Sequence, residues 1–135
     1  MIKAEKLTFG FSSTPLFQNI SFTLEENCHC ALIGSNGTGK TTLINVIAGL
    51  LQPDAGTVSV TGKVSYVFQE PALFPWLTGR DNIAFSLRMQ GKLKGNEDKV
   101  ENMIKVIGLE NFREDYPAQL SGGMAQRVAL VRSLI

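Results

Sequence analysis

The residues best suited to chemistry form one short run, Gly-Ser-Asn-Gly-Thr-Gly-Lys-Thr-Thr at positions 34–42. Gly34, Gly39, Lys40 and Thr41 match the spacing G-x-x-x-x-G-K-[ST]. Glycines allow a left-handed backbone, which lets successive amides turn toward one anion. The lysine can reach the β- and γ-phosphates of a nucleotide, and the threonine hydroxyl can ligate Mg²⁺. The run predicts a phosphate-binding loop, against the alternative of an ordinary glycine turn before a helix.

The segments on either side of this loop are the elements that must position it. The apolar residues at 28–33 predict a strand that leads into the loop. A helix is expected from about 39 to 48, with Gly49 as its C-terminal stop. The positive end of the helix dipole and the unpaired amides of its first turn would then face the bound phosphates.

The rest of the chain changes from strands to helices along its length. The hydrophobic patterns and turn residues predict strands at 2–9, 17–24, 57–60 and 64–68, and helices at 82–89, 97–107 and 121–134. Asn96 is expected to cap the second of these helices. A buried stripe on that helix is expected from the apolar residues at i, i+3, i+4 and i+7, namely Val100, Met103, Ile104 and Ile107.

Composition narrows the classes of function. Thirteen basic and twelve acidic residues give a net charge of +1, and the basic residues are scattered, so no nucleic-acid partner is expected. No apolar run approaches the ~20 residues that span a bilayer, which predicts a cytoplasmic location. Cys28 and Cys30 flank the only histidine, His29. They are interpreted as part of a strand, with a metal site as the alternative.

A second group of residues could also bind an anion. Ser121-Gly122-Gly123 opens the last predicted helix with a capping hydroxyl and glycines in its first turn. Bare amides and the helix dipole would make this a second anion cradle, although most helix starts of this kind are only structural.

With both groups in view, the whole chain closely resembles the ATP-binding subunits of ABC transporters. Gly34 to Thr41 resembles the Walker A motif, Gln69 the Q-loop glutamine, and Leu120 to Gln126 the signature motif, with Met124 where many members carry glutamine. Phe11 aligns with the aromatic residue that stacks on adenine, and Phe9 is the less favoured choice.

The resemblance implies a set of ATP-contacting residues and a pair of Mg²⁺ ligands. The ATP-contacting residues are Phe11, Gly34, Ser35, Asn36, Gly37, Thr38, Gly39, Lys40, Thr41, Thr42, Gln69, Ser121, Gly122, Gly123 and Gln126. Thr41 and Gln69 are the implied Mg²⁺ ligands. Ser121 and Gly123 would contact the γ-phosphate held by a second subunit, because members of the family form head-to-tail dimers.

The implied fold is an α/β P-loop NTPase domain of the ABC ATPase type, present in part. Residues 1–80 would form the P-loop core with an antiparallel β subdomain, 81–120 the helical subdomain, and 121–135 the signature helix. A transmembrane permease would bind the region Gln69–Thr78 on the cytoplasmic face of the membrane. From the residues alone, the apolar stretch 72–78 is either a contact surface or part of the core.

The implied function is energy coupling in a membrane importer, most like the nitrate, sulfonate and taurine group. In the family, the Walker B aspartate, the catalytic glutamate and the switch histidine follow the signature helix, beyond Ile135. Residues 1–135 are therefore expected to bind ATP weakly and to hydrolyse it negligibly. The alternatives are a soluble ABC protein without a transport role and a non-catalytic nucleotide-binding fragment or regulator.

Overall fold

The computed structural model describes residues 1–135, which divide into two units, Met1–Val64 and Ser65–Ile135. The first unit carries the glycine loop and the second carries the predicted signature helix. None of the helices has the length and apolar character needed to cross a membrane.

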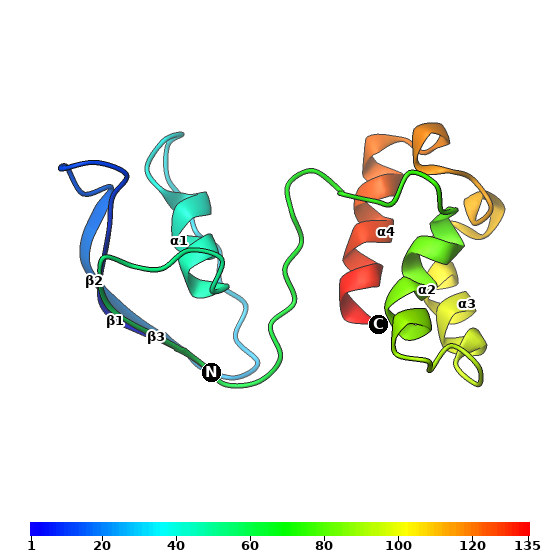
Figure 1. The fold of residues 1–135 in the computed structure, drawn as a ribbon, viewed down its shortest axis with the longest axis horizontal. Coiled ribbons are helices and arrows are strands. Elements are labelled where there is room, and N and C mark those ends of the chain that lie inside the picture. The colour runs from blue at the N-terminus through cyan, green and yellow to red at the C-terminus, as the bar shows by residue number, and fades with distance from the viewer. The chain divides into compact units, whose positions relative to one another are not determined.

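The first unit is an antiparallel sheet covered on one face by a helix (Figure 1). Its strands are β1 (Ile2–Phe9), β2 (Phe17–Leu24) and β3 (Ala55–Val60), in the order β2-β1-β3. The first two strands confirm the sequence prediction. The helix α1 (Lys40–Ile47) packs on the sheet through side chains in a shared core, Ala4, Leu7, Phe9, Phe17, Leu43 and Val46.

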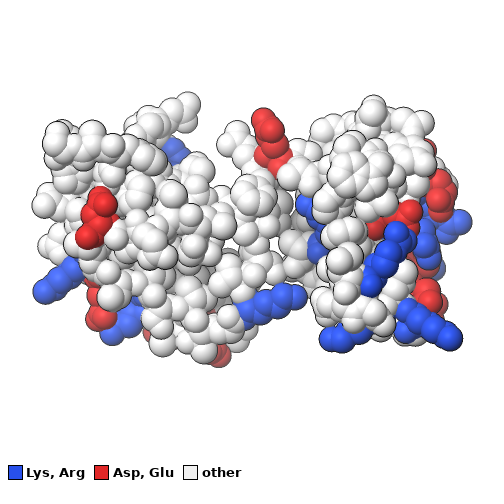
Figure 2. Space-filling model, viewed as in Figure 1, with Lys and Arg blue, Asp and Glu red and all other residues white.

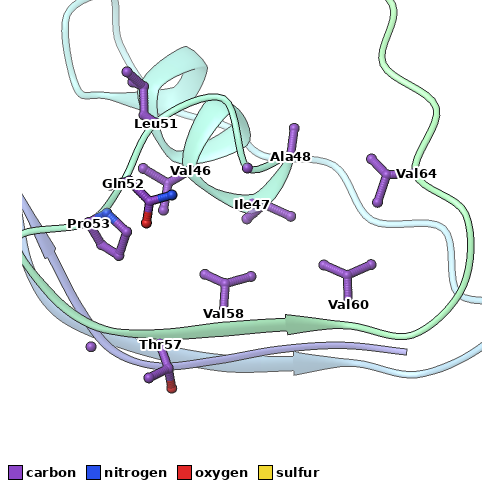
Figure 3. A pocket seen from close by; sticks show the side chains of 12 residues that line it. Val46, Ile47, Ala48, Leu51, Gln52, Pro53, Thr57, Val58, Val60 and Val64 are labelled. Atoms are coloured by element: carbon purple, nitrogen blue, oxygen red, sulfur yellow. The ribbon is translucent and has the colours of Figure 1, made fainter.

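A groove of about 490 Å³ runs between the end of α1 and strand β3. Figure 3 shows Val58 and Val60 of β3 pointing toward Val46 and Ile47 of α1. Gly49, with φ of +74°, ends the helix at the predicted place. The C-terminal half of α1 lines this groove, whereas Leu43 of its first turn packs in the shared core and residues 35–38 of the glycine loop are exposed.

Two predicted strands are not formed. Residues 28–33 contain no strand, and Ile33 is 90% exposed. The strand predicted at 64–68 was wrong as well, because these residues form no strand, whereas the strand at 57–60 forms as part of β3 and pairs with β1. A strand requires a neighbour for its backbone groups, and the three strands of this sheet pair only with one another.

The second unit is a cluster of three helices. In Figure 1 it is the part of the chain coloured from green to red. Its helices are α2 (Gly79–Met89), α3 (Glu97–Val106) and α4 (Gly122–Leu134), with short 3₁₀ turns at Glu110–Phe112 and Pro117–Gln119. The buried core is built from apolar residues one turn apart on each helix, Ile83, Leu87, Val100, Ile104, Val128 and Val131. Met103 and Ile107 pack against it, so the predicted stripe on the second helix is confirmed.

The caps of these helices agree in part with the sequence prediction. Ser121 caps α4, because its Oγ accepts a hydrogen bond from the Met124 amide at 3.3 Å. Asn96 stands at the start of α3, but its amide donates to the Lys92 carbonyl and does not cap the helix. The Glu97 carboxylate instead accepts a hydrogen bond from the Gly95 amide at 2.6 Å.

Opposite charges are interspersed over the second unit on the face that Figure 2 shows. Glu101 of α3 joins two arginines, accepting from Arg80 Nε at 2.6 Å and from Arg113 at 3.3 Å. The hydrogen bond from Arg80 lowers the pKa of the Glu101 carboxyl below its ordinary value. This pairing links α2, α3 and the segment that follows the first 3₁₀ turn.

Gly56 provides a test of the sheet. It has φ of +89° and lies at an irregularity in the β1–β3 pairing, where a Cβ would stand 2.5 Å from the Glu5 carbonyl oxygen. Gly56→Ala should lower the free energy of unfolding by about 3 kcal/mol, because a left-handed alanine and a backbone clash add. Urea denaturation measures this loss. The control, Gly62→Ala, has φ of +104° in open space and should lose only about 1 kcal/mol. Equal losses would contradict the clash at Gly56.

Candidate nucleotide-binding site

The glycine loop folds around the side chain of Lys40. Its ammonium donates hydrogen bonds to the carbonyl oxygens of Gly34 at 2.8 Å and Ser35 at 2.7 Å. The Thr38 hydroxyl donates to the Ser35 carbonyl at 2.9 Å, and Gly39 adopts φ of +88°. The loop therefore closes on itself through a cation at its centre, and α1 begins directly after it.

Gly39 fits tightly against the start of strand β2. A Cβ on Gly39 would stand 3.0 Å from the side chain of Leu16 and 3.4 Å from that of Phe17. Only glycine allows this close approach together with a positive φ. The contact ties the phosphate loop to the residues that follow the loop carrying Phe11.

Three phenylalanines continue from this contact to the surface. The rings of Phe17 and Phe9 stack with centroids 6.0 Å apart, and Phe11 meets Phe9 edge-to-face at 5.0 Å. Phe9 and Phe17 belong to the core, whereas Phe11 is 76% exposed. Phe11 thus has a free π face that can stack on a base, and Phe9 does not. Unbroken contacts run from Gly39 through Phe17 and Phe9 to Phe11.

The donor set beside the loop suits Mg²⁺ bound together with phosphates. Thr41 is exposed in the first turn of α1 and offers a hard hydroxyl oxygen. Mg²⁺ keeps several waters and takes only one or two protein ligands when phosphates supply the rest. Gln69, the other predicted Mg²⁺ ligand, belongs to the second unit and is exposed there.

The two cysteines of the chain, Cys28 and Cys30, are exposed free thiols in the segment that leads into the glycine loop.

Within the second unit, the predicted signature helix lies beside the Q-loop. The Gln126 amide donates to the Phe68 carbonyl at 3.1 Å, immediately before Gln69. At the helix start, a Cβ on Gly122 or Gly123 would meet no atom within 4 Å. Both glycines therefore face open space at the start of the helix, while the Met124 amide donates to Ser121 Oγ.

Asn82, which the sequence analysis did not single out, organises the segment 72–78. Its side chain is fully buried in α2 and accepts a hydrogen bond from the Phe74 amide at 2.9 Å. The same side chain donates to the carbonyl oxygens of Phe74, Leu77 and Thr78 at 3.0–3.1 Å. A single side-chain amide thus pairs with backbone groups of Phe74, Leu77 and Thr78. Its signal in the sequence is an asparagine next to Ile83, on the apolar face of α2.

Arg132 of α4 contacts the same segment and also Asn82, whose Oδ1 accepts a hydrogen bond from the guanidinium at 3.4 Å. Its guanidinium donates to the Ala72 carbonyl at 2.9 Å and lies 5.3 Å from the centroid of the Phe74 ring. Burial lowers the pKa of Arg132 from its ordinary value. Leu73 packs against the helical core, whereas Trp76 is 69% exposed. The segment therefore contributes to the core and also presents an aromatic surface.

A glycine loop before a helix, an antiparallel sheet and a capped glycine helix are the elements that the resemblance to ABC ATPases predicted. The family model described as "ABC transporter" matches residues 17–135, and the chain belongs to this family.

Three curated relatives share about two fifths of their aligned residues with this chain. The sulfate/thiosulfate import ATP-binding protein CysA of Mycobacterium bovis is 41% identical over 128 residues, covering 86% of this chain and 36% of the relative. The nitrate import ATP-binding protein NrtD of Synechocystis is 42% identical, with coverages of 90% and 49%. The aliphatic sulfonates import ATP-binding protein SsuB of Bacillus cereus is 39% identical, with coverages of 89% and 50%. The chain thus spans between about a third and a half of these relatives.

Solved structures give the same family. An ATP-binding subunit of an ABC transporter aligns with a TM-score of 0.84 at 26% identity, covering 98% of this chain and 60% of the other. A dimeric ATP-binding cassette in a post-hydrolysis state, bound to ADP and Pi, aligns with a TM-score of 0.82 at 26% identity, with coverages of 99% and 69%. The chain is therefore part of an α/β ABC ATPase domain.

The role of Asn82 can be tested with the only tryptophan of the chain. Asn82→Ala removes the side-chain hydrogen bonds to Phe74, Leu77 and Thr78 and should lower the free energy of unfolding by about 3 kcal/mol. The anisotropy of Trp76 fluorescence should fall because the segment loses its anchor. Ser86→Ala is the control, since the buried Ser86 hydroxyl has no hydrogen-bond partner and its loss should be nearly neutral. An unchanged anisotropy in Asn82→Ala would contradict the anchoring role.

Proposed function

We propose that this chain belongs to the ATP-binding, energy-coupling subunit of an ABC-type membrane importer, in which ATP hydrolysis drives solute uptake. The observation that carries the proposal is the glycine loop closed around Lys40 and packed by Gly39 against β2. The import ATP-binding proteins among its relatives support the transport role. Their names favour an inorganic oxyanion or a sulfonate as the solute.

The phosphates would bind in the glycine loop. Lys40 already lies within hydrogen-bond distance of two loop carbonyls, and a triphosphate offers its ammonium stronger, charged acceptors. The loop amides and the start of α1 add donors of fixed direction. Thr41 would hold Mg²⁺, which neutralises charge on the phosphates when bound. The implied contacts of the loop are Gly34, Ser35, Asn36, Gly37, Thr38, Gly39, Lys40, Thr41 and Thr42.

The nucleobase would stack on Phe11, whose exposed ring is the outermost of the three phenylalanines. Stacking on one phenylalanine does not distinguish adenine from guanine, so the choice of ATP rests on the family.

The second unit would serve the nucleotide of a partner subunit and the permease. Ser121, Gly122, Gly123 and Gln126 would face the phosphates bound by a second, head-to-tail ATPase subunit, and the dimeric cassettes among similar structures support this arrangement. Gln69 would complete the Mg²⁺ site and sense the nucleotide. The region Gln69–Thr78, which presents the exposed Trp76, would bind a transmembrane permease at the cytoplasmic face of the membrane.

Binding and hydrolysis are separate properties of this chain. Its residues can hold phosphates and a metal ion, whereas none of residues 1–135 is proposed to orient the attacking water. We therefore expect residues 1–135 by themselves to bind ATP with negligible turnover, and the intact subunit to hydrolyse it.

The phosphate site is tested by titrating the chain with Mg·ATP in a calorimeter. Lys40→Ala should weaken binding at least about tenfold, because a charged hydrogen-bond donor is lost from the loop. Lys63→Ala removes an equal charge from an exposed turn of the same unit and should leave the affinity unchanged. An affinity of Lys40→Ala equal to that of the unsubstituted chain would refute the proposed phosphate site. Circular dichroism on each variant establishes that the fold is retained.

A further inference from the structure

Asp54 anchors the loop that carries Phe11. Its carboxylate Oδ2 accepts a hydrogen bond from the Gly10 amide at 2.8 Å, across 44 positions of the chain. Its own amide donates to the Thr8 carbonyl at 2.9 Å. Asp54 is thus held by its backbone at the end of β1, while its side chain holds the first residue of the following loop.

The loop from Gly10 to Pro15 is closed at both ends. The Leu16 amide donates to the Phe9 carbonyl at 2.7 Å, which joins the residues on either side of the loop. A Cβ on Gly10 would stand 2.9 Å from the Thr14 carbonyl oxygen, so the loop is also tight inside. The hydrogen bond from the Gly10 amide to Asp54 connects this loop to the segment just before β3.

The Phe11 ring itself has little else to fix it. It contacts Phe9 at its edge and is otherwise mostly in solvent. An exposed aromatic side chain on a loop free to move would lose conformational freedom on stacking with a base. Because the backbone at Gly10, one residue before Phe11, is already fixed, part of this entropy loss is avoided when the ring binds a base.

We propose that Asp54 is a positioning residue for nucleobase binding, which presets the backbone at Gly10 so that Phe11 presents its ring to the base at a fixed distance from the phosphate loop. The inference rests on the proposed function, since it assigns a role in the same nucleotide site. It adds a residue outside the glycine loop, on the segment just before β3. The ligand class is a nucleoside triphosphate whose base and phosphates are held by separate parts of one unit.

The test compares Mg·ATP with Mg·tripolyphosphate, which carries the phosphates without the base. Asp54→Ala should weaken ATP binding about fivefold, because the bond is charge-assisted but exposed to water, and should leave tripolyphosphate binding unchanged. Asp54→Asn retains an acceptor oxygen and should recover most of the ATP affinity. Glu25→Ala, an exposed carboxylate at the far end of β2, is the matched control and should affect neither ligand.

A double substitution separates positioning from general stability. In Phe11→Ala, which has no ring to position, adding Asp54→Ala should cause no further loss of ATP affinity. If Asp54→Ala and Asp54→Asn lose affinity for ATP and for tripolyphosphate to the same extent, the role of Asp54 is overturned. It is also overturned if the losses of ATP affinity from Phe11→Ala and Asp54→Ala add in the double variant. Unchanged ATP affinity in Asp54→Ala would overturn it too. Failure of the unsubstituted chain to bind either ligand would instead refute the phosphate site itself.

Discussion

The close approach of Gly39 to Leu16 and Phe17 is the contact on which the candidate site depends. It places the phosphate loop against the strand that begins just after the Phe11 loop, and the stacked rings of Phe17 and Phe9 carry the connection to Phe11. A side chain larger than hydrogen at position 39 would push these parts away from each other and would strain the backbone as well. The spacing between the glycine loop and Phe11 is therefore a property of core packing, because two of the three rings are core residues.

A different interaction organises the helical unit. There, the buried side-chain amide of Asn82 makes hydrogen bonds to the backbone of the irregular segment 72–78. Asn82 pairs with backbone groups of Phe74, Leu77 and Thr78, and Arg132 reaches the same segment from α4. Buried polar groups are costly when unpaired, so such a network specifies one conformation for the segment. The helix that begins at the signature motif and the segment proposed to face a permease thus share one set of hydrogen bonds. Displacement of α4 would be felt at Phe74 and Ala72, because both lie against Arg132.

Local patterns predicted the parts of the fold that are decided locally. β1, β2, α1 and α3 were expected within a residue or two of their observed bounds, since alternation, helical periodicity and glycine stops act over short distances. The start of α2 was placed three residues late, because the capping hydroxyl of Thr78 precedes the apolar face. The strands at 28–33 and 64–68 were wrong, because a strand depends on neighbours that no local pattern reveals. The Gly10–Asp54 bond joins residues too distant in sequence to be paired by inspection.

The sequence by itself determined the chemistry: a glycine loop with Lys40 and Thr41, a capped glycine helix at Ser121, and a resemblance to ABC ATPases that the family comparison bears out. These follow from residue types at fixed short spacings, which act through the backbone around them. Only the tertiary structure decided which phenylalanine is core and which is exposed, and that Gly39 rests on β2. It also decided that Asn82 and Asp54 hold the segments next to the functional residues. These outcomes depend on contacts between residues far apart in the chain, whose partners are set by packing.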